Sequence, residues 1–299
     1  MLAFGFLYNI IQRGNASYDR VQHLLAEKED VIDHADAVDV TPEGNLHVEI
    51  NAFTYPDESE PVLSEIGFDL KSGETLGIVG RTGSGKTSLL KLLMREYDTY
   101  DGEISFADVK IQDYTVRALR EAIGYVPQDQ FLFSTTVRDN IRFGKPEAPQ
   151  EEVSKIAQLV SVDEDILGFE HGYDTIVGER GVSLSGGQKQ RLAIARALIM
   201  NPELLILDDA LSAVDAKTEE QILSNLKENR SDKTTIISAH RLSSVEHANL
   251  IIVIDKGRIV ERGTHSELMT LDGWYAEMFH EQQLEEALEE GGAADGSDE

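Results

Sequence analysis

The chain contains no cysteine among its 299 residues. This absence excludes disulfides and a thiolate nucleophile, and it fits a reducing cytosol. Basic residues are also scarce, because 27 Lys and Arg stand against 55 Asp and Glu and leave a formal net charge of -28. Such a negative chain repels the phosphate backbone, which argues against a nucleic-acid partner. Hydrophobic residues still make up 41%, enough for the core of one large domain or two small ones.

The N-terminus lacks a hydrophobic run of membrane-spanning length. The uncharged start, MLAFGFLYNIIQ up to Gln12, is shorter than the roughly 20 apolar residues that cross a bilayer. It also lacks the basic region and the small-residue cleavage site of a signal peptide. Two interpretations stay open from the residues alone. The segment is either an amphipathic helix packed on the domain or the cytoplasmic end of a membrane helix whose remainder is missing.

Strand and helix patterns alternate along the rest of the chain. Residues 36–45 are polar, contain Pro42 and Gly44, and are expected to form a linker. The runs LHVEINAFTY, VLSEIGFDL, TLGIVG, ELLILDD, TTIISAH and LIIVIDKGRIV predict strands, several of them buried. Strands that alternate with helices imply an α/β fold with a largely parallel sheet. Residues of about 115–200 suggest an inserted helical subdomain, and the acidic residues 283–299 suggest a disordered tail.

The segment GRTGSGKT, from Gly80 to Thr87, fits the phosphate-binding pattern G-x-x-x-x-G-K-[ST] between a predicted strand and a predicted helix. In such a loop the glycines let backbone N–H groups surround an anion, and the following helix directs its positive end at the phosphates. Lys86 is expected to reach the β- and γ-phosphates, and the Thr87 hydroxyl to bind Mg²⁺. The predicted ligands are therefore ATP and Mg²⁺. The predicted nucleotide-binding residues are Gly80, Arg81, Thr82, Gly83, Ser84, Gly85, Lys86, Thr87 and Ser88.

The segment LLILDDALSAVD, from Leu204 to Asp215, ends an aliphatic run on two adjacent carboxylates. A P-loop enzyme needs a carboxylate at the end of a neighbouring apolar strand to hold the Mg²⁺ shell, and Asp208 is predicted to be that residue. Asp209 is placed to polarise an attacking water. Adjacency alone does not aim a side chain, so a turn-forming role stays open for Asp209.

The segment LSGGQKQR, from Leu184 to Arg191, resembles the signature motif of ABC ATPases. The chain from about residue 1 to 282 is similar to the nucleotide-binding domain of an ABC transporter, more narrowly of an exporter half. The resemblance implies a P-loop NTPase (RecA-like) core with an antiparallel β subdomain and an inserted α-helical subdomain, here within residues 46–282. It also implies that two such domains pair head to tail as a homo- or heterodimer. The residues that would then close on the partner's ATP are Leu184, Ser185, Gly186, Gly187 and Gln188.

Further motifs fall on positions that match this family. Tyr55 in AFTYPD resembles the aromatic residue that stacks on adenine. Gln128 in GYVPQDQ resembles the Q-loop glutamine, which reaches Mg²⁺ and water while its loop touches the membrane domain. His240 in IISAHRL resembles the switch histidine that contacts the γ-phosphate. Asp215 in SAVD resembles the D-loop aspartate that communicates across the dimer.

Two features favour an exporter over other members of this family. The segment VGERG resembles the exporter X-loop, whose Glu179 would couple to the membrane domain. The segment FGFLYNIIQRGNASYDRV resembles the cytoplasmic end of the sixth membrane helix, so residues 1–35 are expected to be that end and a connecting helix. The chain is then expected to be a piece of a longer half-transporter at the cytoplasmic face of a bacterial cell membrane. Its partners would be its own transmembrane domain and a second half-transporter.

One position departs from the family pattern. Consensus members carry Glu after the Walker B aspartate, where this chain carries Asp209. The Asp side chain is one methylene shorter, and such a loss of positioning costs about 10²-fold in rate. A slow site is expected here, in a heterodimer whose partner has that Glu and an altered signature motif. The alternatives are a homodimer that tolerates Asp, a soluble ABC ATPase acting on nucleic acid or ribosomes, and a regulatory module without turnover.

Overall fold

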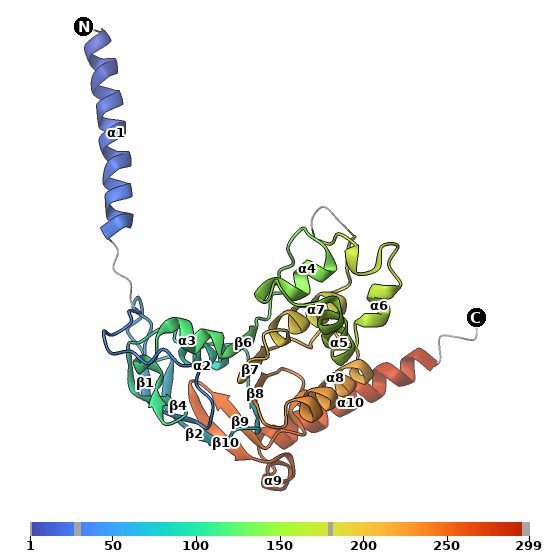
Figure 1. The fold of residues 1–299 in the computed structure, drawn as a ribbon. Coiled ribbons are helices and arrows are strands. Elements are labelled where there is room, and N and C mark those ends of the chain that lie inside the picture. The colour runs from blue at the N-terminus through green and yellow to red at the C-terminus, as the bar shows by residue number, and fades with distance from the viewer. Residues whose placement is uncertain (1, 27–30, 179–181, 295–299) are drawn as a thin grey trace. The chain divides into compact units, whose positions relative to one another are not determined.

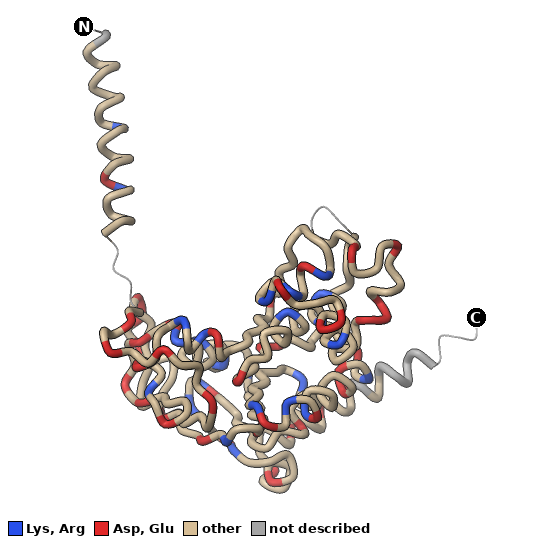
Figure 2. Tube along the Cα trace, in the orientation of Figure 1, with Lys and Arg blue, Asp and Glu red and all other residues tan. Residues whose placement is uncertain are grey.

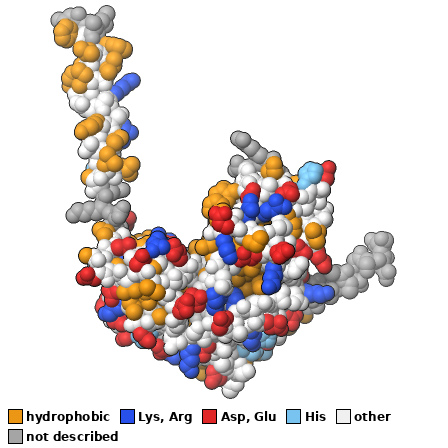
Figure 3. All heavy atoms as spheres, in the orientation of Figure 1, with side chains coloured by type: hydrophobic (Ala, Val, Ile, Leu, Met, Phe, Trp, Pro, Cys, Tyr) orange, Lys and Arg blue, Asp and Glu red, His pale blue; other side chains and the backbone are white. Residues whose placement is uncertain are grey.

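The computed structural model describes residues 2–26, 31–178 and 182–294, and it divides into two units, residues 1–32 and 33–299 (Figure 1). The first unit consists of helix α1, Leu2–Ala26. Large apolar side chains lie exposed along this helix, among them Phe4 and Leu24 (Figure 3). Within the described ranges, none of the helices combines the length and the apolar character that a membrane crossing requires.

The second unit contains two sheets. The larger sheet has the strand order β10-β9-β3-β8-β7-β6, in which neighbouring strands are parallel except for the β9–β10 pair (Figure 1). The smaller sheet is antiparallel, with the order β2-β1-β4-β5. The strands are β1 Leu46–Phe53, β2 Leu63–Leu70, β3 Thr75–Val79, β4 Tyr100–Phe106, β5 Val109–Lys110, β6 Ile123–Val126, β7 Leu204–Asp208, β8 Thr234–Ser238, β9 Leu250–Asp255 and β10 Arg258–Gly263. This arrangement confirms the predicted α/β fold with a parallel core and an antiparallel β subdomain.

Helices connect several of these strands. The α-helices are α2 Lys86–Leu93, α3 Val116–Glu121, α4 Val137–Ile141, α5 Gln150–Leu159, α6 Asp163–Leu167, α7 Gly186–Leu198, α8 Ala216–Asn229, α9 His265–Leu271 and α10 Trp274–Ala294. Short 3-10 turns add η1 Ile111–Asp113, η2 Arg142–Gly144, η3 Gly172–Asp174 and η4 Leu242–Val245. Helices α4 to α7 all lie in the chain between β6 and β7, which makes this segment the helical insertion (Figure 1).

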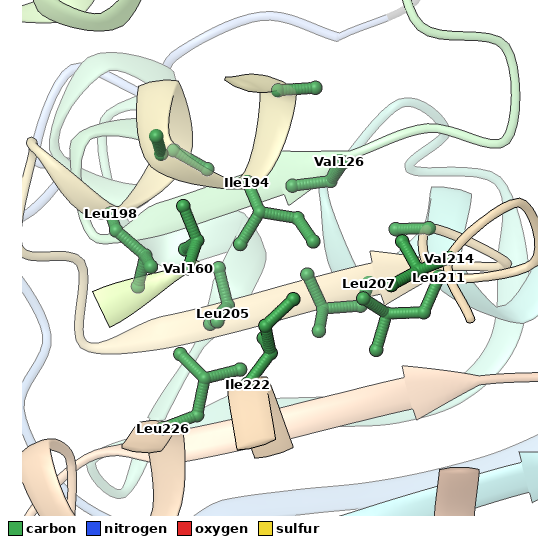
Figure 4. Packing of buried hydrophobic residues seen from close by; sticks show 14 of the residues in the cluster. Val126, Val160, Ile194, Leu198, Leu205, Leu207, Leu211, Val214, Ile222 and Leu226 are labelled. Atoms are coloured by element: carbon green, nitrogen blue, oxygen red, sulfur yellow. The ribbon is translucent and has the colours of Figure 1, made fainter. Parts of the chain in front are cut away.

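Strand β7 explains the aliphatic run that precedes the paired carboxylates. Its side chains alternate between two hydrophobic cores, because a strand directs successive residues to opposite faces. Leu205 and Leu207 enter the core formed with α7 and α8 (Figure 4), whereas Leu204 and Ile206 enter the core shared with the antiparallel sheet. Both faces of β7 are therefore buried, as in the covered parallel sheets of α/β proteins.

Two predicted boundaries need correction. The helical insertion begins after β6 rather than at about residue 115, because Ile123–Val126 pairs with β7 as a strand of the main sheet. The disordered tail predicted for residues 283–299 is also shorter, because α10 continues to Ala294. Residues 281–290 are EQQLEEALEE, and Glu, Gln, Leu and Ala are strong helix formers. Their composition therefore supports a helix despite its acidity.

The predicted linker, residues 36–45, is attached to the second unit. Val38 forms an isolated bridge with Tyr114. The Asp39 carboxylate accepts hydrogen bonds from the Thr115 hydroxyl at 2.7 Å and from the Arg117 guanidinium at 2.6 Å. These bonds lower the pKa of Asp39. The start of the second unit thus follows the domain surface before β1.

Candidate functional site

The loop between β3 and α2 has a backbone that requires glycine. Gly80 has a φ of 145°, and a Cβ there would lie 2.1 Å from the Ile254 carbonyl oxygen. Gly85 precedes α2 as its N-cap with a φ of 108°. Residues that carry a side chain rarely adopt such φ values, so both positions depend on glycine. The free N–H groups at the start of α2 then face the space in front of the loop, as in anion-binding helix termini.

Lys86 reaches over the loop from the first turn of α2. Its ammonium group donates to the carbonyl oxygens of Gly80 at 2.7 Å and Arg81 at 3.1 Å. Burial lowers the pKa of Lys86, and the nearby carboxylates of Asp208 and Asp209 oppose that shift. The loop therefore holds a buried positive charge beside the helix N-terminus, which is a suitable place for phosphate groups.

Two side-chain oxygens from separate elements, those of Thr87 and Asp208, lie close together. The Thr87 hydroxyl donates to Oδ2 of Asp208 at 3.2 Å. The Tyr125 hydroxyl donates to the same oxygen at 3.5 Å. Asp208 is 5% exposed at the end of β7, two strands from β3 in the sheet. A hydroxyl and a single carboxylate fit Mg²⁺, which is usually bound by one or two carboxylates together with substrate phosphates.

Asp209 follows directly in the left-handed backbone region. Its φ is 50°, a conformation that Asp tolerates better than most residues. Its backbone N–H donates to the carbonyl oxygen of Ser238 at 2.7 Å, which fixes the residue against β8. Its carboxylate accepts a hydrogen bond from Nε2 of Gln128 at 3.3 Å. Asp209 is therefore anchored through its main chain, and its side chain meets Gln128.

The structure brings about half of the predicted site residues around one pocket, and the loop residues Gly80, Arg81 and Ser84 are not part of its lining. The lining residues are Val62, Thr82, Gly83, Gly85, Lys86, Thr87, Ser88, Gln128, Asp208, Asp209 and His240. His240 comes from the segment after β8, and its carbonyl oxygen accepts from Nε2 of Gln282 at 2.9 Å. Four strand ends, those of β3, β6, β7 and β8, therefore deliver side chains to the same space. Ligands bind at this carboxyl edge in open α/β sheets.

Two lining or supporting residues were not predicted from the sequence. Val62 lines the pocket from the segment before β2, and no motif marks it. Tyr125 holds the Asp208 carboxylate from β6. Its position three residues before Gln128 is the signal that could have identified it, because the end of a neighbouring parallel strand reaches the same edge of the sheet. Both residues belong to the surroundings of the phosphate loop.

Tyr55 lies beside this pocket rather than in its lining. Its hydroxyl is 2.9 Å from the Ser88 hydroxyl, and its ring packs edge-on against Phe53 and Tyr97. The ammonium of Lys91 lies 5.9 Å from the ring centroid. Tyr55 is partly exposed, so part of its ring is available at the side of α2. Its role toward adenine stays a prediction.

The signature residues form the start of α7 and lie outside the pocket lined by Lys86 and Asp208, which we call the phosphate pocket. Ser185 caps the helix in a capping box with Gln188, and a Cβ at Gly187 would lie 2.8 Å from the Ala213 carbonyl oxygen. Leu184 is buried, whereas Ser185 and Gly186 are exposed. None of these five residues, 184 to 188, lines the pocket that holds Lys86 and Asp208. The start of α7 therefore lies at the surface, outside that pocket.

Two predicted residues remain, Asp215 and Glu179. Asp215 caps α8, accepting the Thr218 N–H at 3.0 Å. That hydrogen bond lowers the pKa of Asp215. Glu179 lies outside the described residues.

Comparison with known proteins identifies the family. Residues 63–212 match the family model described as ABC transporter. The chain belongs to the ABC transporter family. The prediction of an ABC nucleotide-binding domain of exporter type, with the P-loop ATPase fold, is thereby confirmed.

Two relatives carry multidrug resistance in their names, and a similar solved structure is an ABC exporter. A probable multidrug resistance ABC transporter ATP-binding/permease protein, YheI of Bacillus subtilis, is 51% identical over 98% of this chain and 50% of its own length. The multidrug resistance-like ATP-binding protein MdlA of Escherichia coli is 50% identical over 97% of this chain and 49% of its own. A solved structure of a bacterial Atm1-family ABC exporter with ATP bound matches with a TM-score of 0.85 and 38% identity, over 93% of this chain and 49% of that one. The ABC domain described here thus spans about half the length of these relatives.

Proposed function

We propose that this ABC domain is the ATP-binding and ATP-hydrolysing part of a multidrug- or lipid-type exporter, at the cytoplasmic face of a bacterial membrane. Two such domains would enclose ATP head to tail, and closing and reopening of the pair would drive attached membrane helices. The observation that carries the proposal is the meeting of Lys86, Thr87, Asp208, Asp209 and His240 around one pocket. A phosphate-binding loop, a magnesium carboxylate and polar groups at the γ-phosphate position are the parts that phosphoryl transfer requires.

The residues of this pocket would have different roles in binding and hydrolysis. The loop N–H groups and Lys86 would bind the phosphates, because both supply positive charge at the N-terminus of α2. Thr87, Asp208 and Gln128 would hold Mg²⁺, which neutralises charge on the phosphate oxygens when it is bound. Asp209 would polarise the attacking water, and His240 would contact the γ-phosphate. Tyr55 would stack on the adenine at the side of α2.

We infer that this site hydrolyses ATP slowly. The main chain of Asp209 is fixed by the 2.7 Å hydrogen bond from its N–H to Ser238, so the backbone does not advance freely to replace the missing methylene. Its carboxylate is also engaged by Gln128 at 3.3 Å. A carboxylate that is one methylene too short and cannot move forward does not orient the attacking water well. Such a loss of positioning lowers the rate of hydrolysis by about 10²-fold.

The signature helix supports a role toward a partner's nucleotide. Ser185 and the first residues of α7 are exposed and lie apart from the chain's own phosphate pocket. A second domain could therefore bring its ATP to this helix N-terminus, where free N–H groups favour phosphate. In a heterodimer whose partner has the Glu after its Walker B aspartate and an altered signature motif, the fast site would be the partner's site, completed by the intact signature of this chain. The acidic net charge of -28 disfavours the alternative of an ATPase that acts on nucleic acid.

The test is a mixing experiment with a candidate partner half-transporter that carries Glu after its Walker B aspartate. ATPase turnover is measured for each chain alone and for the mixture. The proposal predicts that the mixture is much faster than the sum of the separate chains. A mixture that equals the sum, together with a fast chain alone, would favour the homodimer.

A further inference from the structure

A second cavity lies at the amino-terminal ends of the central strands of the main sheet. Its lining comes from the segments that precede β3, β8 and β9, and from the end of α8. The nucleotide pocket lies at the carboxyl ends of the strands, and the two cavities share no lining residue. The second cavity has a volume of about 260 Å³, which equals the liquid volume of roughly nine water molecules. It therefore has room for a small molecule.

The charge of this cavity is opposite to that of the chain. Lys227, Arg230, Lys233 and His247 line it, and the lining contains no Asp or Glu. Acidic residues outnumber basic ones 55 to 27 in the sequence, and they are spread over the second unit (Figure 2). A lining with three permanent cations and no carboxylate therefore contrasts with the rest of the surface. Such a cavity attracts anions.

Arg230 is the buried member of this group. Its residue is 5% exposed, and only its Nη2 donates hydrogen bonds within the described part of the chain, to Pro202 O at 3.0 Å and Thr234 O at 3.3 Å. Its Nε is buried without a hydrogen-bond partner. No carboxylate of the described residues forms an ion pair with it, although Glu203 and Asp232 act on it at longer range. Burial accordingly lowers the pKa of Arg230 to about 10.

Two other lining residues can donate to an anion. The side chain of Lys227, an exposed residue of α8, forms no ion pair or hydrogen bond within residues 31–178 and 182–294. Asn249 uses its Oδ1 to accept the Thr75 N–H at 2.8 Å, which leaves its NH₂ group as a donor. Lys233 contributes less, because its ammonium already binds Glu203 at 2.8 Å.

The cavity also has an apolar wall. Leu223 and Leu226 of α8, with Ile237 and Ala248, complete its lining. A wall of this kind suits a short hydrocarbon chain, whereas the cationic residues suit a charged head group. We propose that this cavity binds a small amphiphilic anion, a carboxylate or phosphate head group on a short apolar chain, independently of ATP.

The site is tested by isothermal titration calorimetry on the full 299-residue chain with hexyl phosphate, hexanoate and the neutral control hexanol. Saturating Mg·ADP blocks the nucleotide pocket, and the titrations are repeated without Mg·ADP for comparison. We expect one or both anions to bind and hexanol not to bind, and the comparison of the anions identifies the preferred head group. No binding of either anion, or binding that appears only without Mg·ADP, would overturn the proposal.

Matched variants locate the bound anion. Lys227→Glu reverses one lining charge, whereas Lys217→Glu makes the same change on the exposed surface of the same helix, outside the cavity. We expect Lys227→Glu to weaken binding about tenfold and Lys217→Glu to leave it within about twofold, because screening limits the effect of distant charges. Equal losses in the two variants, or no loss in either, would place the anion elsewhere. Arg230→Met should abolish binding, and circular dichroism checks that this buried variant is folded.

Discussion

Nε2 of Gln128 donates to Oδ2 of Asp209 at 3.3 Å, which links the segment after β6 to the segment after β7. These two strands are parallel neighbours, so their carboxyl ends bring both side chains to the same pocket. In the proposed reaction Gln128 would reach Mg²⁺ and the attacking water, and Asp209 would polarise that water. Their direct contact shows that the shorter Asp side chain still reaches the Q-loop amide. The missing methylene therefore changes the position of the Asp209 carboxylate relative to the attacking water.

The signature serine offers a test that separates folding from function. Ser185→Ala removes the cap of α7 and should lower the free energy of unfolding by about 1 kcal/mol. Thr264→Ala removes an equivalent capping box from α9 and should cost a similar amount. Urea unfolding measures both, and ATPase turnover is then measured in a mixture with the candidate partner. We expect Ser185→Ala to lower turnover at least tenfold more than Thr264→Ala does, and equal turnover would contradict the role of the signature toward the partner.

The core around β7 should be sensitive to truncation. Leu205 is fully buried between α7 and α8, so Leu205→Ala should lower the free energy of unfolding by about 2–5 kcal/mol (Figure 4). Leu167→Ala is the matched control, because this leucine is 65% exposed and its truncation should cost less than about 0.5 kcal/mol. Urea denaturation measures both variants. Comparable losses would show that β7 is not packed as described.

The raised pKa of Tyr125 predicts that the stability of the protein depends on pH above neutrality. Burial, with help from the Asp208 carboxylate, raises the pKa of Tyr125 to about 12. A tyrosine in the unfolded chain ionises near pH 10, so between about pH 10 and 12 the unfolded chain binds fewer protons and stability falls. The stabilising effect is present below pH 10 and is lost as the pH rises through 12.

The comparison with Tyr125→Phe isolates this effect, because every other tyrosine is common to both proteins. Urea unfolding at several pH values from 9 to 12 should show wild-type stability falling more steeply than that of the variant. Parallel curves would mean that the hydroxyl of Tyr125 is not buried against Asp208.

Sequence patterns identified many of the residues that line the pocket because each motif is local. A glycine loop, a strand that ends in Asp208 and a histidine after another strand each carry their own signal, and parallel strands deliver all of them to one edge. The contact between Thr87 and Asp208 joins residues far apart in the chain, so it follows from the strand order rather than from either motif. Val62 has no motif, and only the fold places it in the lining.

The incorrect boundaries have physical reasons of the same kind. Strand β6 is the short segment Ile123–Val126, whose periodicity is too brief to separate it from flanking helices. Its identity depends on pairing with β7, which is a tertiary contact. The acidic segment after residue 282 was predicted to be disordered from its charge, whereas its Glu, Leu and Ala residues favour the continuation of α10 to Ala294.

Asp209→Glu is the change that bears most directly on the proposed slow site. Glu restores the missing methylene, although it must adopt the left-handed φ of 50° that Asp209 has, which favours Asp modestly. The measurement is the steady-state ATPase turnover of the chain alone, of Asp209→Glu, and of Asp209→Asn as the control that removes the charge. We predict slow turnover for the wild type, an increase of about tenfold to 10²-fold for Asp209→Glu, and a further loss for Asp209→Asn. A wild-type chain that turns over as fast as Asp209→Glu would contradict the account.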